Sequence, residues 1–135
     1  MGKELLQLVK VVRVSAASAA GTTAITGSTV DTQGFDGVMF VTAAQTITST
    51  GVQSIKIQHG DASDLSDAAD VSGTSVTIAD SDDDKAVVTD LSDLSKRYVR
   101  AVISRATANS AFGEVFAFLY RAQQKPVVQS GIVSL

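Results

Sequence analysis

The sequence predicts an all-β protein, a sandwich or barrel of about eight or nine strands in a single domain over residues 1–135. Val, Ile and Thr together number 38, against 8 Leu and 2 Glu. Such β-branched side chains favour strands because they are stiff at the first torsion angle and pack well on a pleated surface. Short apolar runs of period two recur between polar turn segments, and a chain of this length can bury one core.

The first half of the chain contains its strongest strand signal. The expected strands are, in order, Leu8–Ser15, a weak Ile25–Asp31, Val38–Ala43, a short piece at Ile47, and Val52–His59. Small residues over 16–24 predict a loop, and Gly34 and Gly37 flank Phe35 ahead of the strongest strand. These signals predict four or five strands before residue 60.

The second half alternates polar loops with strands. The expected strands are Val76–Ile78, Ala86–Thr89, Tyr98–Arg105 and Phe112–Arg121. The polar stretch Asp61–Gly73 predicts a loop, and Thr107–Ser110 predicts a hairpin connection between the last two strands. At most one helical turn is expected, near residues 63–69 or 91–96. An apolar tail comes after the single proline, Pro126.

Two of the expected strands are apolar on both faces. They are Val38–Ala43, where Val38 and Phe40 oppose Met39, Val41 and Ala43, and Val115–Tyr120, where Phe116, Phe118 and Tyr120 oppose Val115, Ala117 and Leu119. One face can fill a sandwich core, and the other requires cover from an N-terminal arm (about 1–9), a C-terminal tail (about 126–135) or another subunit. The sequence leaves open whether the tail or a neighbour provides it. The predicted core contains Phe35, Val38, Phe40, Ile55, Val99, Phe116 and Phe118.

The net charge of −3 conceals two blocks of opposite sign. Asp61–Asp93 contains ten Asp and one Lys, whereas Lys96–Lys125 contains six basic residues and one Glu. Such blocks can be complementary between copies or toward a shell of other subunits, or they can be solvated surfaces. The acidic balance and the lack of a recognisable module argue against nucleic-acid binding.

The residues that carry catalytic chemistry are sparse. The absence of cysteine excludes disulfides and thiolate metal sites, and His59 is the only histidine. No Gly-x-Ser-x-Gly elbow accompanies that histidine, so we expect no enzyme, no cofactor and no small-molecule substrate. The segment Met1–Leu6 has no long apolar core, and Lys10 and Arg13 interrupt the apolar residues after it. We therefore expect neither a signal peptide nor a membrane span.

Acidic clusters raise the alternative of calcium binding. Asp61, Asp64, Asp67 and Asp70 recur every three residues, and Asp80–Lys85 reads DSDDDK. Carboxylate oxygens suit a hard cation, but the sixth position counted from Asp82 is Val87, where the loop template requires Gly. We predict no metal site, with weak calcium binding by these loops as the alternative.

A set of short motifs in a particular order resembles a family of virion proteins. The motifs are Asp31-Thr32-Gln33-Gly34-Phe35, Phe40-Val41, Lys96-Arg97-Tyr98-Val99-Arg100 and Pro126-Val127, which together span roughly Val30–Val127. Their order is similar to that of the head decoration, or cement, proteins of tailed bacteriophages. The resemblance departs at His59–Asp64, where such proteins often carry a Glu-Ser-Asp-Asp-type segment.

The resemblance implies a jelly-roll-like antiparallel β-sandwich of about eight strands, made in the host bacterial cytoplasm and bound to the outside of the phage head. It further implies a homo-oligomer that stabilises the shell by bridging major capsid subunits, with no membrane partner. The expected capsid or self-association contacts are Leu5, Leu6, Leu8, Val127, Val128, Ile132, Val133 and Leu135. The alternatives are another virion β-protein (tail-tube, neck or spike) and a carbohydrate-binding sandwich. The second is poorly supplied with aromatic residues, since the chain has no Trp, 2 Tyr and 5 Phe.

Overall fold

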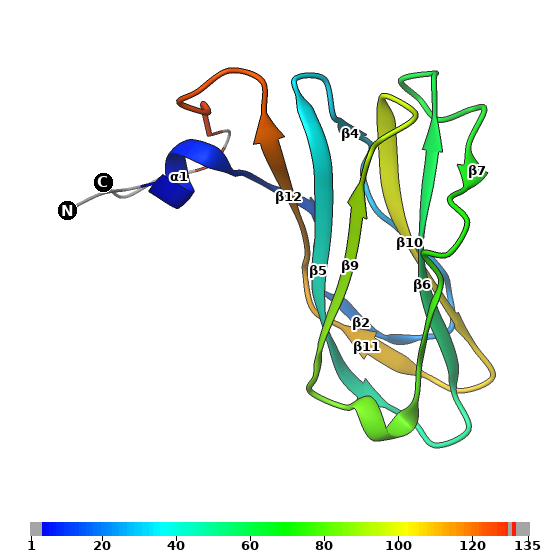
Figure 1. Cartoon of the computed structure of the whole chain (residues 1–135). Helices are drawn as coiled ribbons and strands as arrows, with labels where there is room; N and C mark the ends of the chain where they lie inside the picture. Colours follow the sequence, from blue (N-terminus) through cyan, green and yellow to red (C-terminus); the bar gives the residue numbers. More distant parts are fainter. Residues whose placement is uncertain (1–3, 130, 132–135) are drawn as a thin grey trace.

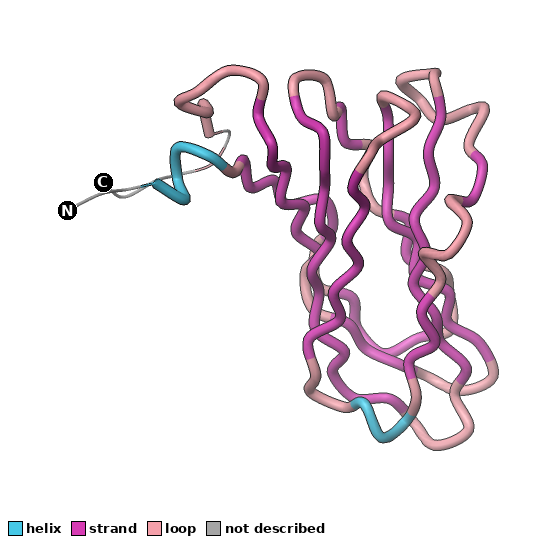
Figure 2. Tube along the Cα trace, in the orientation of Figure 1, coloured by secondary structure: helices cyan, strands magenta, loops and turns pink. Residues whose placement is uncertain are grey.

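The β-branched runs of the sequence form two sheets that pack face to face in a computed structural model describing residues 4–129 and Gly131 (Figures 1 and 2). The elements of the first half are α1 (Glu4–Leu8), β1 (Lys10–Ser15), β2 (Ser18–Gly21), β3 (Ile25–Thr26), β4 (Val30–Asp31), β5 (Phe35–Ile47) and β6 (Val52–Gly60). The elements of the second half are β7 (Ala69–Asp70), β8 (Val76–Ile78), the 3-10 turn η1 (Asp80–Asp82), β9 (Ala86–Ser92), β10 (Tyr98–Ala106), β11 (Ser110–Phe112) and β12 (Val115–Ala122).

The strand order is that of a jelly roll. The first sheet has the order β1-β12-β5-β11-β2 with β9 on the other side of β5, and the second has the order β3-β10-β6-β7 with β4 on β10 and β8 on β6. Consecutive short strands share a row, so β1 with β2, β3 with β4, β7 with β8, and β11 with β12 each form one interrupted row. Numbering the rows along the chain gives 1-8-3-6 and 2-7-4-5, which is the jelly-roll order, with antiparallel pairing throughout. The expected fold class is confirmed.

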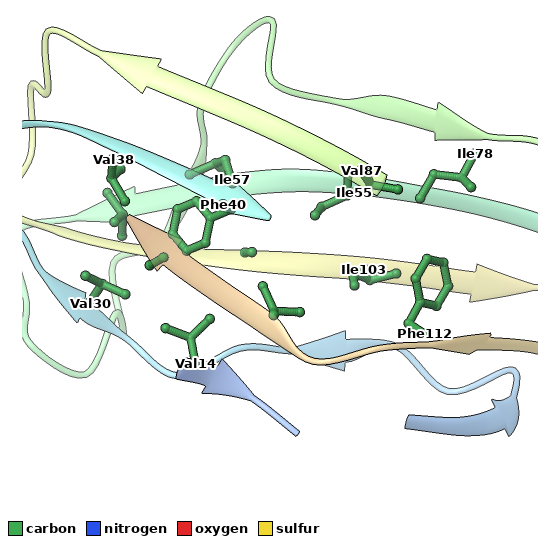
Figure 3. Close-up of a cluster of buried hydrophobic side chains, with 14 of the residues drawn as sticks. Val14, Val30, Val38, Phe40, Ile55, Ile57, Ile78, Val87, Ile103 and Phe112 are labelled. Carbon is green, nitrogen blue, oxygen red and sulfur yellow. The ribbon is translucent and has the colours of Figure 1, made fainter. Parts of the chain in front are cut away.

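The core lies between the inner faces of the two sheets. Phe40 and Phe112 from the first sheet are fully buried, as are Ile55, Ile57 and Ile103 from the second (Figure 3). Period two places these side chains on one face of each strand, so burial holds the two sheets together. Of the predicted core residues, Val38, Phe40, Ile55 and Val99 are fully buried, and Phe35 packs against the core while partly exposed.

The prediction that Phe116 and Phe118 belong to the core is wrong. In β12 the buried side chains are Val115, Ala117 and Leu119, and the two phenylalanines are half-buried on the opposite face. The register explains this result, because Ala117 lies beside Phe40 in the neighbouring strand. A small side chain leaves room for the large ring in a densely packed interior.

Tertiary structure also changed several local expectations. Residue Leu8 ends a helix rather than starting a strand, and the expected loop over 16–24 contains β2. The connection over 107–110 is not a hairpin, because it carries the chain from β10 in one sheet to β11 in the other. The expected strand at 38–43 and the piece at Ile47 are one strand, β5. The described 3-10 turn, η1, lies outside both segments where a helical turn was expected.

The acidic and basic blocks pair partly with each other inside the chain. Lys96 Nζ lies 2.6 Å from a carboxylate oxygen of Asp61, and Arg121 Nη1 lies 3.9 Å from one of Asp93. The carboxylates also stabilise the loops, since Asp67 accepts hydrogen bonds from the backbone N–H groups of Asp61 and Ala62. The first of these bonds is the main cause of the lowered pKa of Asp67. Turn formation thus gives the acidic loops a structural role.

Candidate interaction surface

The outer face of the first sheet carries a continuous apolar surface. Two cross-strand rows run from β1 through β12 and β5 to β9; they are Val11–Phe118–Met39–Asp90 and Arg13–Phe116–Val41–Val88. The central four side chains are half-buried, and Val88 at the edge is 51% exposed. Contiguous apolar side chains on the outside of a sheet make this surface the candidate interaction site of the described residues. We call these two rows the outer face.

The two ends of the described chain form a projection beside this face. We call α1, Val9 and the tail segment 126–129 the terminal arm. In Figure 1 the terminal arm extends away from the sandwich, next to the upper part of β12. A five-residue helix is too short to be stable by itself, so tertiary contacts must hold it.

Gln129 supplies the contacts that fasten the tail to the N-terminal segment. Its side-chain Nε2 donates to the carbonyl oxygens of Leu6 at 2.9 Å and of Val9 at 2.6 Å. Its Oε1 accepts a hydrogen bond of 3.1 Å from the backbone N–H of Val11, at the start of edge strand β1. The backbone N–H of Val127 donates to the carbonyl oxygen of Gln7 at 2.9 Å. These bonds satisfy backbone groups at the end of α1 and on the edge of the sheet.

A groove of about 910 Å³ lies between the terminal arm and the outer face. It is lined by Leu5, Leu6, Val9, Val11, Met39, Asp90, Ser92, Phe118, Tyr120 and Arg121. Most of this lining is apolar, and the polar side chains come from β9 and the end of β12. A concave apolar site with a few polar groups is suited to bind another molecule.

Tyr120 closes one side of the groove and is itself tightly placed. Its ring lies over Gly37 in the neighbouring strand, where a Cβ atom would clash with the ring carbons. Its hydroxyl donates to Asp90 Oδ1 at 2.5 Å. Burial, followed by this hydrogen bond to the carboxylate, raises the pKa of Tyr120 to about 12. The ring therefore requires glycine at position 37 and holds Asp90 at the rim.

The expected contact residues lie largely on the terminal arm. Leu5 is 74% exposed and Leu8 38% exposed, whereas Leu6 is half-buried in the groove lining. Val127 is half-buried and Val128 is 83% exposed. The expected contacts Ile132, Val133 and Leu135 lie outside the described residues.

Sequence reasoning missed several residues of the surface. The doubly apolar strands had indicated a second apolar face, and Met39 and Val41 were assigned to the face opposite Phe40 correctly. Phe116 and Phe118 were missed as surface residues because they had been assigned to the core. No signal in the sequence marked Gln129, whose role depends on contacts across more than 100 residues.

The residues considered for catalysis or metal binding are not brought together. His59 is half-buried on β6, paired with Val99 on one side and Ala69 on the other. Within residues 4–129 and Gly131, no group of three His, Asp or Glu side chains is placed to hold a metal ion. The described part of the chain also contains no helix long and apolar enough to cross a membrane.

The fold and the surface together define a jelly-roll β-sandwich protein with an apolar groove on the outside of one sheet. No family model and no curated protein matches the sequence. Among solved structures, the chain is similar to the PBSX exported protein XepA, with a TM-score of 0.58 and 19% identity over 97% of this chain. The chain spans 43% of the length of XepA.

Two further solved structures share the fold. The SPBc2 prophage-derived protein YomS matches 83% of this chain and 94% of its own, with a TM-score of 0.50 and 12% identity. A chain from Bacillus endospore appendages, described as a novel family of disulfide-linked pili, matches 84% of this chain and 88% of its own. Its TM-score is 0.50 and its identity 16%. At these identities the similarity is one of fold.

Proposed function

We propose that this chain is a non-enzymatic structural protein of a bacteriophage virion, which binds the outside of the head and bridges major capsid subunits. The observation that carries the proposal is the apolar docking surface, formed by the outer face and the groove beneath the terminal arm. Apolar area left open on a small domain is suited to a partner that completes its burial.

Two independent observations support this proposal. The motif order from Asp31 to Val127 resembles that of phage head decoration proteins. The fold is similar to that of a prophage-derived protein, YomS, and of an exported protein, XepA. A jelly roll is also a common architecture of viral shell components.

The mechanism would be cementing through many modest contacts. Each copy would touch more than one capsid subunit, so that the second contact forms at a high effective concentration. Burial of the outer face would contribute about 25 cal/mol per Å² of apolar area, before the entropic cost of association. Arg13 and Asp90, at opposite edges of the outer face, would help to set orientation.

Binding to empty heads tests the proposal. Heads assembled from major capsid protein alone are mixed with the purified chain and sedimented, and the bound copies are counted. We expect saturable binding that Val41→Asp abolishes, because the carboxylate would lie in the centre of the apolar contact. Val102→Asp is the matched control, since Val102 is also a half-buried valine on a central strand but belongs to the second sheet. Absence of binding, or loss with Val102→Asp and not Val41→Asp, contradicts the proposal.

A second candidate is a subunit of another virion part or surface appendage. The observation in its favour is the fold similarity to the endospore appendage chain. Gold-labelled antibody against the chain distinguishes the two on intact particles. Label over the head supports the cement role, and label confined to the tail or to filaments supports this candidate.

A further inference from the structure

We propose that the free edge of β9 accepts an extended, basic segment of a partner protein, which adds one strand to the first sheet. The site consists of backbone N–H and C=O groups and of a second groove beside them. The inference goes beyond the proposed function, which rests on the outer face and on the groove beneath the terminal arm.

The strand β9 forms one edge of the first sheet, on the side of β5 away from β12 (Figure 1). It is seven residues long, and its register against β5 continues without a bulge from Ala86 to Ser92. The strand contains no proline and no lysine. Short strands, bulges, prolines and lysines are the devices that keep an edge from pairing with another chain, and β9 has none of them.

The other edges of the described sandwich carry such protection. On the opposite edge of the first sheet, β1 has an irregularity between Arg13 and Ser15, and the N–H of Val11 donates to Gln129 Oε1. The next edge strand of that sheet, β2, has four residues. The outer strands of the second sheet, β3, β4, β7 and β8, have two or three residues each. Among the described strands, β9 is therefore the long edge that stays open.

Hydrogen bonds around β5 show which backbone groups of β9 point outward. The N–H of Ala44 donates to the carbonyl oxygen of Lys85 at 3.0 Å, at the start of β9. On the other side of β5, the carbonyl oxygen of Ala43 accepts a bond of 2.9 Å from the N–H of Gly113. Pairs in an antiparallel ladder alternate, so the residues of β9 that bond to β5 are Val87, Thr89 and Leu91. The residues whose N–H and C=O groups point away from the sheet are Ala86, Val88, Asp90 and Ser92.

A groove of about 370 Å³ lies beside this edge, between β9 and strand β8 of the second sheet. Its lining includes Val76 and Ile78 on one side and Ala86, Val87 and Val88 on the other. A strand added to β9 would place every second side chain in this groove. Backbone hydrogen bonds would then supply affinity, and the groove would favour apolar residues at alternate positions of the partner segment.

The surroundings of the edge are acidic. The turn before β9 contains four aspartates within 80–84, and the single lysine beside them, Lys85, already lies 3.1 Å from Asp82. At the other end, Asp90 is exposed and the side chain of Asp93 is 93% exposed. This charge favours a basic segment. It also disfavours a second copy of the chain, because twofold pairing of two β9 strands would bring the acidic turn of each copy toward Asp90 and Asp93 of the other.

Titration of the isotope-labelled chain with a synthetic peptide is the first test, followed by nuclear magnetic resonance. The peptide Lys-Val-Thr-Val-Thr-Val-Lys places three valines on one face and a lysine at each end. We expect saturable binding that slows amide hydrogen exchange about tenfold or more at the four outward residues of β9, and leaves the three inward ones unchanged. Protection at every second residue is the signature of an added strand. Unchanged exchange at the outward residues overturns the inference.

Two altered peptides separate the backbone contacts from the charge. The first is N-methylated at the five residues between the lysines, which removes their donors, and the second has glutamate in place of each lysine. We expect both to bind about tenfold more weakly or worse. Equal affinity of the N-methylated peptide overturns the strand addition, and equal affinity of the glutamate peptide overturns the basic character of the partner.

The substitution Val88→Pro tests the site from the side of the chain. Because the N–H of Val88 points away from β5, proline removes an outward donor and leaves the bonds to β5 in place. Val88→Thr is the matched control, since threonine keeps the N–H and the branched shape. We expect peptide affinity to fall about tenfold or more in Val88→Pro and to change less than about twofold in Val88→Thr. Equal affinities overturn the inference, and the altered peptides decide it if circular dichroism shows Val88→Pro unfolded.

Sedimentation equilibrium of the chain alone distinguishes the two possible occupants of the edge. A chain whose association state is the same in Val88→Pro supports a separate partner. A dimer that Val88→Pro abolishes would identify a second copy as the occupant and overturn the inference. None of these assays contains phage heads, so their failure would leave the proposed function standing.

Discussion

Phe40 and Phe116 lie on neighbouring strands of the first sheet and on opposite faces of it. Phe40 is fully buried, and its ring lies beside Ala117 between the two sheets. Phe116 is half-buried on the outer face, beside Val41. Replacing each phenylalanine by alanine removes the same atoms from two different environments. Comparing the two losses in the free energy of unfolding therefore shows which face of the sheet forms the core.

The expected losses in the free energy of unfolding differ several-fold between the two substitutions. Phe40→Ala removes a fully buried ring and leaves a cavity, which typically costs about 3–5 kcal/mol of the free energy of unfolding. Phe116→Ala removes a ring that is already in part hydrated, and half of the transfer free energy of a phenylalanine is about 1 kcal/mol. With a urea dependence of about 2 kcal/mol per M, the midpoint should fall by about 1.5–2.5 M for Phe40→Ala and by about 0.5 M for Phe116→Ala.

Urea unfolding followed by far-ultraviolet circular dichroism measures both values, since the chain has no tryptophan for fluorescence. Both variants are compared at the same low protein concentration, so that self-association does not contribute. Equal losses in the free energy of unfolding, or a larger loss for Phe116→Ala, would refute the assignment of Phe116 to the exposed face of β12. The same result would remove the evidence for the outer face.

Three other predictions concern the groove and the terminal arm. Gly37→Ala should lower the free energy of unfolding by about 1–3 kcal/mol in urea unfolding, because the added methyl displaces the ring of Tyr120; an unchanged midpoint would contradict this. Phenolate absorbance should show Tyr120 titrating near pH 12, and Asp90→Asn should lower its pKa. The stabilisation from that raised pKa is complete below the pKa of about 10 in the unfolded chain and is lost as the pH rises toward 12. Gln129→Ala should speed amide hydrogen exchange at Val11 while leaving β5 protected, and unchanged exchange would show that the tail does not hold the arm.

The fold class was predictable because it depends on local patterns. The β-branched composition and the period-two runs indicated strands, and the strands at Val52–Gly60 and Tyr98–Ala106 lie within one residue of their expected bounds. The hairpin at 107–110 was wrong because turn residues record that the chain changes direction. They do not record whether it returns to the same sheet or crosses to the other.

The candidate surface was predictable only in outline. Doubly apolar strands indicated that one face would need cover. The termini were expected to make contacts with partners, which stays a prediction, and the structure shows Leu5 and Val128 exposed there. The groove between the terminal arm and the outer face was not predictable. It depends on a helix of five residues and on Gln129, which contacts residues near the opposite end of the sequence.

The amino-acid sequence by itself determined that the chain forms a β-sandwich with more apolar strand surface than one core requires. Only the tertiary structure decided which surface remains outside. Phe116 and Ala117 are neighbours in the chain, and alternation places them on opposite faces whichever face is inside. Register against β5 sets Ala117 beside Phe40, and dense packing of that pair turns the larger ring of Phe116 outward.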